Sequence, residues 1–165
     1  MNSKKPELKS LQSHSLPLVI FLITRELHIA LDRRMARYGL THRQAKLLIR
    51  CVHNSGASLN QLMPHLGTDN AGVSRLVDRL EAANLVERTP GPDRRSLALK
   101  ATEAGVALAP KLEEVFRLIN QNLIEGLSRE DIDVADELLH RILTNVRILN
   151  DNDKSPDKGF PCRME

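Results

Sequence analysis

The spacing of apolar residues along the chain predicts a mainly helical protein. Apolar side chains recur every three or four positions, which builds one buried stripe along a helix. This spacing extends over three long segments, residues 15–38, 102–126 and 128–150. It also marks three shorter segments that follow one another closely, residues 41–53, 58–66 and 70–83. Short helices joined by tight turns in this order are typical of a helix-turn-helix motif.

Polar residues that can cap a helix stand before each predicted start. Thr41 and Ser58 are each followed three residues later by a glutamine, Gln44 and Gln61, which is the capping-box pattern. The other predicted helices follow Ser15, Thr68 or Asp69, Thr102, and Ser128. Gly39, after the first helix, suits the left-handed backbone with which many helices end.

Two segments of a different kind follow the third short helix. Residues 85–88 and 96–99 have the length and partial alternation of half-buried strands. The residues between them include Pro90, Gly91 and Pro92, which favour a turn. We therefore expect a β-hairpin, or wing, that carries Asp93, Arg94 and Arg95 at its tip.

The third short helix has two unlike faces. Its apolar stripe consists of Val73, Leu76, Val77 and Leu80. The other face carries small and hydrogen-bonding residues in the first turn and arginines after it, which suits a helix that enters a DNA major groove end-first. The residues of this helix that we expect to contact DNA are Asn70, Ala71, Ser74, Arg75 and Arg79.

The long helices carry more apolar surface than one chain can cover. Residues 18–23 are all apolar, so a helix there must be covered on more than one side. This predicts a homodimer built by the helices at both ends of the chain. The resulting organisation is a mobile arm at 1–14, a helical dimerisation region at 15–40 and 102–150, a DNA-binding lobe at 41–101, and a polar tail at 151–165.

Charge and composition narrow the choice of partner. Nine basic and five acidic residues give residues 41–101 a net charge of +4, whereas five basic and eleven acidic residues give 102–153 a net charge of −6. A polyanion is therefore expected to meet the middle of the chain. Aromatic residues make up only 2% of the sequence, which argues against the stacking platforms that bind single strands.

Other classes of protein find little support in the sequence. Cys51 and Cys162 give no disulfide framework and favour a reducing cytoplasm. The apolar run at 16–23 is too short to span a membrane and lacks a signal cleavage site. No phosphate-binding glycine loop, nucleophile elbow or pair of carboxylates in an apolar setting is present, and the histidines are not spaced as a ligand set. We expect no catalysis, metal or cofactor.

Residues 27–150 also resemble the MarR-type winged helix-turn-helix transcriptional regulators. The resemblance rests on the order and spacing of Leu40-Thr41-x-x-Gln44, Val73-Ser74-Arg75-Leu76-Val77-Asp78-Arg79-Leu80-Glu81, Leu85-Val86-Glu87-Arg88, Asp93-Arg94-Arg95, and Thr102-Glu103-x-Gly105. The sequence departs from the family pattern at Asn84, where glycine is usual, at Ala71 and Gly72, where hydroxyl residues are common, and at His42, where proline is frequent. Asparagine is tolerable at position 84 because it also visits the left-handed region.

The resemblance implies a two-fold dimer whose two winged lobes bind a pseudo-palindromic duplex operator. The helix from Asn70 to Ala83 would then enter the major groove, and Arg95, oriented by Asp93, would reach the minor groove. Family members often bind small aromatic or phenolic anions between the dimer helices and the lobe. The residues that could line such a site here are Arg25, His28, Tyr38 and His42.

These observations predict a cytoplasmic, homodimeric regulator of transcription, a repressor that a small ligand releases from DNA. One alternative is a thiol switch at Cys51, although its apolar surroundings favour a core residue. Peroxide-sensing relatives carry their reactive cysteine near the start of the first helix, and residues 16–21 contain none. A second alternative is a winged-helix module for protein assembly, against which the paired arginines of the wing argue.

Overall fold

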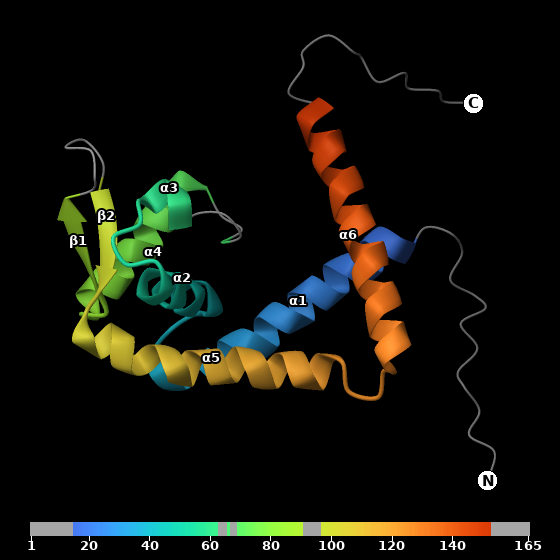
Figure 1. Ribbon diagram of the computed structural model, residues 1–165, viewed down its shortest axis with the longest axis horizontal. Helices are drawn as coiled ribbons and strands as arrows, with labels where there is room; N and C mark the ends of the chain where they lie inside the picture. The colour runs from blue at the N-terminus through green and yellow to red at the C-terminus, as the bar shows by residue number, and fades with distance from the viewer. Residues whose placement is uncertain (1–14, 63–65, 67–68, 91–96, 153–165) are drawn as a thin grey trace. The chain divides into compact units, whose positions relative to one another are not determined.

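The computed structural model describes residues 15–62, 66, 69–90 and 97–152. Figure 1 shows the described elements along the chain. The helices are α1 (Ser15–Met35), the 3₁₀ turn η1 (Ala36–Tyr38), α2 (His42–His53), α3 (Leu59–Leu62), α4 (Asn70–Ala82), α5 (Glu103–Leu123) and α6 (Arg129–Asn152), and the strands are β1 (Val86–Pro90) and β2 (Leu97–Ala101). The chain divides into two compact units, one ending at Asn120 and one beginning at Gln121. The prediction of a mainly helical chain with a small wing is confirmed.

The capping residues act as the sequence predicts. Gly39 adopts a left-handed φ of 69° after η1. Thr41 and Gln44 then form a reciprocal capping box, in which the Thr41 N–H donates to Gln44 Oε1 at 2.8 Å. At α3, the Ser58 N–H donates to Gln61 Oε1 at 2.8 Å. These contacts satisfy backbone amides that have no partner within the helix.

The ends of α4 are also set by single residues. Asp69 Oδ1 accepts a hydrogen bond of 2.8 Å from the Gly72 N–H, which identifies Asp69 as the cap. After the helix, Asn84 has a φ of 54°, in the left-handed region that asparagine tolerates better than most residues. This residue turns the chain from α4 into β1, where the family pattern usually has glycine.

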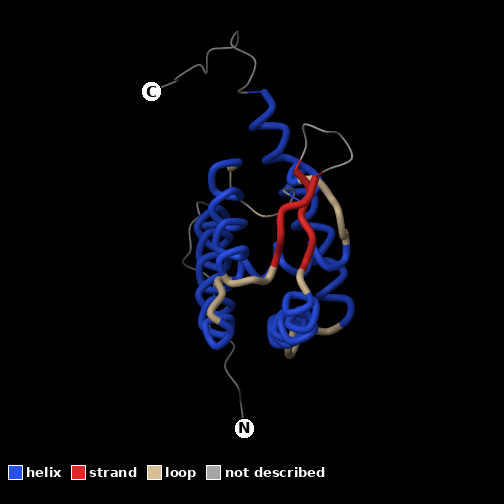
Figure 2. Tube along the Cα trace, turned by 90° about the vertical axis from the view of Figure 1, so that its left-hand side faces the viewer, coloured by secondary structure: helices blue, strands red, loops and turns tan. Residues whose placement is uncertain are grey.

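The wing is a two-stranded antiparallel sheet (Figure 2). In its register, Val86 pairs with Ala101 and Pro90 with Leu97. Each strand ends two residues later than predicted. The prediction was wrong at Pro90, which we assigned to the turn, because a proline can close a strand at the edge of a sheet where no N–H is needed. The tip with Asp93, Arg94 and Arg95 lies outside the described residues.

A short segment before α3 ties the helix-turn-helix to the wing. The Leu99 N–H donates to Ala57 O at 3.1 Å, and the Gly56 N–H donates to Leu99 O at 3.1 Å. Because these bonds lie on the free side of β2, the helices and the hairpin form one lobe.

The core of the first unit lies where α2, α4, α5 and the strands meet. Its fully buried side chains include Leu47, Leu48, Leu62, Leu80, Leu99 and Leu112. Cys51 is also fully buried, as predicted for a core residue. Thr102 Oγ1 accepts from the Gly105 N–H at 3.1 Å and thereby caps α5.

Gly105 permits the close contact between α5 and the start of the wing. A Cβ atom at this position would lie 2.1 Å from the carbonyl oxygen of Leu85 and 3.0 Å from Leu48 Cδ1. No side chain fits without moving backbone, so the Thr-Glu-x-Gly segment has a steric reason for its glycine.

Large apolar side chains remain exposed in both units. On α1 they are Leu16, Leu18, Val19, Phe21, Leu22, Ile23 and Ile29, and on α6 they are Val134, Leu138, Leu139, Leu143, Val146, Ile148 and Leu149. The helix α6 includes Asp151 and Asn152, which we expected in the tail. Within the described residues, no helix is long and apolar enough to cross a membrane.

Candidate nucleic-acid interface

The helix α4 buries one face and exposes the other. Val73, Val77 and Leu80 are buried, and Leu76 is half-buried. The predicted contact residues Ala71, Ser74, Arg75 and Arg79 are exposed. The backbone of Asn70 opens the helix, while its side chain lies outside the described part of the structure.

Two of these residues meet a third arginine that the sequence analysis missed. A shallow pocket of about 210 Å³ is lined by Arg43, Gly72, Arg75, Leu76 and Arg79. Arg43 reaches it from the first turn of α2, and the other residues belong to α4. Within residues 15–62, 69–90 and 97–152, no carboxylate lies within ion-pair distance of these three guanidinium groups. The pocket is therefore a concentrated positive patch beside the exposed face of α4.

The position of α4 relative to the wing is fixed by an ionic cluster. The guanidinium of Arg88, in β1, donates to Asp78 Oδ1 at 2.6 Å and also to Glu81 Oε2. The backbone N–H of Arg88 donates to Glu81 Oε1 at 3.0 Å. The hydrogen bond to Asp78, followed by the nearby charge of Glu81, raises the pKa of Arg88 despite its partial burial. We call Asp78, Glu81 and Arg88 the wing clamp.

The candidate ligand residues separate into two groups. The rings of His28 and His42 stack with centroids 4.4 Å apart. Arg25, by contrast, is exposed and pairs with Glu26 at 2.6 Å. Tyr38 is half-buried beneath the guanidinium of Arg37, which lies 4.9 Å from its ring centroid. The structure therefore brings together only the two histidines of this set.

Asp32 completes the group around the two histidines. Its Oδ1 accepts from the backbone N–H of His42 at 2.7 Å and lies 2.8 Å from the His42 Nδ1. Burial opposes ionisation of Asp32, but the hydrogen bonds from His42 outweigh it and lower its pKa. Burial, together with the positive charges of His42 and Arg43, lowers the pKa of His28. Asp32 lies ten residues from His42, so no short motif could have identified the pair.

Cys51 shows the properties of a structural thiol. It is fully buried in the lobe, and this burial raises its pKa to about 12. Thiol oxidation proceeds through the thiolate at accessible sites. Its surroundings therefore oppose the reactivity that a redox switch needs.

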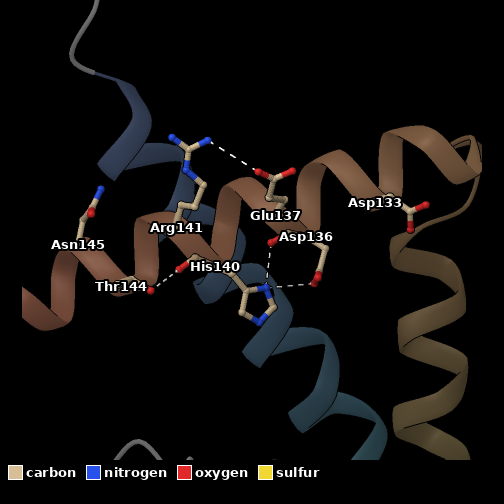
Figure 3. A pocket seen from close by; sticks show the side chains of 7 residues that line it. All are labelled: Asp133, Asp136, Glu137, His140, Arg141, Thr144 and Asn145. Carbon is tan, nitrogen blue, oxygen red and sulfur yellow. Dashed lines mark hydrogen bonds and ion pairs between the residues drawn. The ribbon is translucent and has the colours of Figure 1, made fainter.

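A hollow on α6 does not qualify as a site (Figure 3). The residues that line it all come from one helix: Asp133, Asp136, Glu137, His140, Arg141, Thr144 and Asn145. His140 Nδ1 lies 3.3 Å from Asp136 Oδ1, and Arg141 lies 3.9 Å from Glu137, both as neighbours one turn apart. Such pairs are usual on a solvated helix face. Among the described residues, no three His, Cys, Asp or Glu side chains are placed to hold a metal ion.

Comparison with known proteins finds a family similarity within the lobe. The sequence profile of the MarR family matches residues 40–97. Residues 40–97 therefore form a segment that is similar to the MarR family. The matched residues extend from the end of the α1–α2 connection to the start of β2. They include Arg43, all of α4 and the wing clamp.

MarR-family relatives extend the similarity beyond this segment. The multiple antibiotic resistance protein MarR of Escherichia coli is 26% identical over 129 residues, which cover 76% of this chain and 88% of that protein. The HTH-type transcriptional regulator MhqR of Bacillus subtilis is 23% identical over 137 residues, which cover 82% of this chain and 94% of that protein.

Solved MarR-type structures share the fold. The S. aureus MepR–DNA complex aligns with a TM-score of 0.74 and 22% identity, covering 79% of this chain and 97% of that one. A MarR-family regulator from Listeria monocytogenes, complexed with a 26mer DNA, aligns with a TM-score of 0.75 and 20% identity, covering 88% and 98% of the two chains. These alignments confirm the winged-helix fold.

Proposed function

We propose that this chain is a homodimeric regulator of transcription that binds duplex DNA sequence-specifically in the cytoplasm. The observation that carries the proposal is the exposed face of α4, with Ser74, Arg75 and Arg79, backed by a fully packed opposite face. A rigid helix with exposed polar side chains and nearby arginines can contact both base edges and phosphates. The MarR-family structures that were solved with DNA add support to this assignment.

The wing is proposed as a second contact. Arg95 would enter the minor groove, with Asp93 orienting its guanidinium and Arg94 beside it. Arginine is favoured in a narrow minor groove because the negative potential there is strong. The wing clamp supports this arrangement, since it fixes β1 against α4.

The exposed apolar residues of α1 support the homodimer. Leu18, Phe21 and Ile23 are among seven large apolar side chains that this helix leaves exposed. A contiguous apolar surface of this kind marks an interface. A dimer would present two copies of α4 to a pseudo-palindromic operator.

Release by a small ligand is the proposed control of a repressor. The joint between α1 and α2 is a suitable place because His28 and His42 are stacked there beside Arg43. A small aromatic or phenolic anion could approach these groups, with Arg25 and Tyr38 as further candidates. The burial and raised pKa of Cys51 weigh against the redox alternative.

Fluorescence anisotropy with a labelled mixed-sequence duplex tests DNA binding directly. We expect binding that weakens linearly with the logarithm of salt concentration, since each phosphate neutralised contributes about −0.9 to the slope. Arg75→Ala, Arg79→Ala and Arg95→Ala should each weaken binding roughly tenfold, because each removes a charged hydrogen-bonding group. Arg95→Ala should also flatten the salt dependence.

Arg117→Ala is the matched control, because it removes one arginine from α5, where Arg117 pairs with Glu114. Its affinity should equal that of the wild type. Wild-type protein that binds no duplex, or α4 variants that bind as tightly as wild type, would contradict the proposal and favour a protein-assembly module.

A further inference from the structure

We propose that Arg43, Arg75 and Arg79 together form a binding site for one DNA backbone phosphate. Arg43 belongs to α2, whereas the other two arginines belong to α4. This inference rests on the proposed function. It goes beyond that function by assigning a contact outside α4 and the wing, and by naming the group that is bound.

The shape of the pocket suits a small group. Its volume is about 210 Å³, below the usual range for drug-sized ligands. Gly72 contributes no side chain to the wall, and Leu76 is half-buried beside it. The charged residues in the lining are therefore the three arginines, and the space between them suits a compact ligand.

The charge of the pocket selects an anion. Three arginines border one small space, and the described residues place no carboxylate within ion-pair distance of any of them. Like charges at short range repel one another, and a bound anion removes this repulsion. Phosphate matches the planar fork of a guanidinium, which can donate two parallel hydrogen bonds to it.

The location of Arg43 argues for a phosphate and against a base. Arg75 and Arg79 lie one helical turn apart on α4, whereas Arg43 is held half-buried on a different helix. A side chain anchored in the supporting helix is suited to fix the register of the protein on the duplex, which is the role of phosphate contacts. Contacts of this kind raise affinity for every sequence alike.

The test compares Arg43→Gln and Arg43→Lys with Arg117→Gln, which removes the same charge from α5. Salt series are recorded by anisotropy on a duplex enriched from a random pool and on a scrambled duplex of equal length. Arg43→Gln should weaken binding to both duplexes by the same factor, roughly tenfold. It should reduce the salt slope by at most about 0.9 per protomer, because Arg75 and Arg79 still contact the phosphate. Arg43→Lys should keep the slope, and Arg117→Gln should match wild type.

The outcomes separate this inference from the proposed function. Wild-type protein that binds neither duplex overturns both. Wild-type binding with an unchanged slope and affinity in Arg43→Gln overturns the phosphate site alone. A loss confined to the enriched duplex also overturns it, because Arg43 would then read a base.

A measurement without DNA guards against a folding defect in Arg43→Gln. The melting temperatures of wild type and variant are compared in phosphate and in chloride at equal ionic strength. Phosphate should stabilise the wild type more than the variant, because a ligand that binds only the folded state raises its stability. Equal shifts in the two proteins would overturn the site.

Discussion

Three side chains join α1 to the first turn of α2. Asp32 accepts a backbone hydrogen bond from His42 at 2.7 Å, and His28 stacks on the His42 ring. His42 stands where proline is frequent in the family, and only a residue with an N–H can make this bond. His42, which departs from the family pattern, therefore makes a contact between α1 and the lobe.

The lowered pKa of His28 makes this joint sensitive to acid. An unfolded histidine titrates near 6.5. Below that pH the unfolded state takes up a proton more readily than the folded state, so stability is lost as the pH falls through about 6.5 toward the folded pKa. Asp32 adds a loss at lower pH, as it is protonated below its usual value of 3.8.

Urea unfolding at about pH 7.5, 6 and 5 measures this effect. The free energy of unfolding should fall on acidification, by at most about 1.4 kcal/mol per pH unit from His28. His28→Gln should show a smaller fall than wild type, whereas His140→Gln, on the exposed face of α6, should not. Parallel pH profiles for wild type and His28→Gln would show that His28 does not cause the loss of stability in acid.

At the scale of elements, the wing clamp holds β1 to α4. Arg88→Met should lower the free energy of unfolding by about 1–3 kcal/mol, because it removes charge-assisted hydrogen bonds that are partly screened from water. Arg88→Met should also weaken DNA binding, because the wing would no longer be fixed against α4. Arg88 itself is not proposed as a DNA contact.

Lys100→Met is the control for this prediction. Lys100 pairs with Glu87 at 3.8 Å on the exposed side of the hairpin, and such a pair contributes less than about 1 kcal/mol. Chemical denaturation and anisotropy should separate the two variants. Equal effects on stability, or intact DNA binding in Arg88→Met, would contradict the role assigned to the clamp.

Local signals predicted most of the elements. Thr41, Asp69, Thr102 and Ser128 all cap the helices they precede, since each makes its contact within three residues. The left-handed Asn84 followed from the conformational freedom of asparagine. The strand ends were misplaced because a proline is allowed in a turn and also at a strand edge.

Contacts between distant residues could not be predicted in this way. Arg88 bonds to Glu81 and Asp78 across a turn whose geometry the sequence does not specify. Arg43 was missed because the predicted DNA contacts were taken from α4 and the wing alone. A signal was present, since Arg43, Lys46 and Arg50 recur at helical spacing between the buried residues of α2. The convergence of Arg43 with α4 depends on how the two helices pack.

At the scale of the molecule, basic charge, acidic charge and exposed apolar surface lie in different segments of the chain. The segment 41–101 carries the excess of basic residues and the winged-helix lobe, and 102–153 carries the excess of acidic ones. Within the described part of the chain, seven large apolar side chains of α1 stay exposed, which supports the proposed second copy of the chain. A two-fold dimer of this kind would bind a DNA site that consists of two inverted half-sites.

Sequencing the duplexes that the wild-type protein enriches from a random pool tests this account most directly. Two copies of α4 related by a two-fold axis should enrich an inverted repeat, with half-sites separated by about one turn of DNA, 10–10.5 base pairs, or a multiple of it. Enrichment of no sequence, or of a single half-site without its inverted copy, would contradict a dimeric reader of duplex DNA.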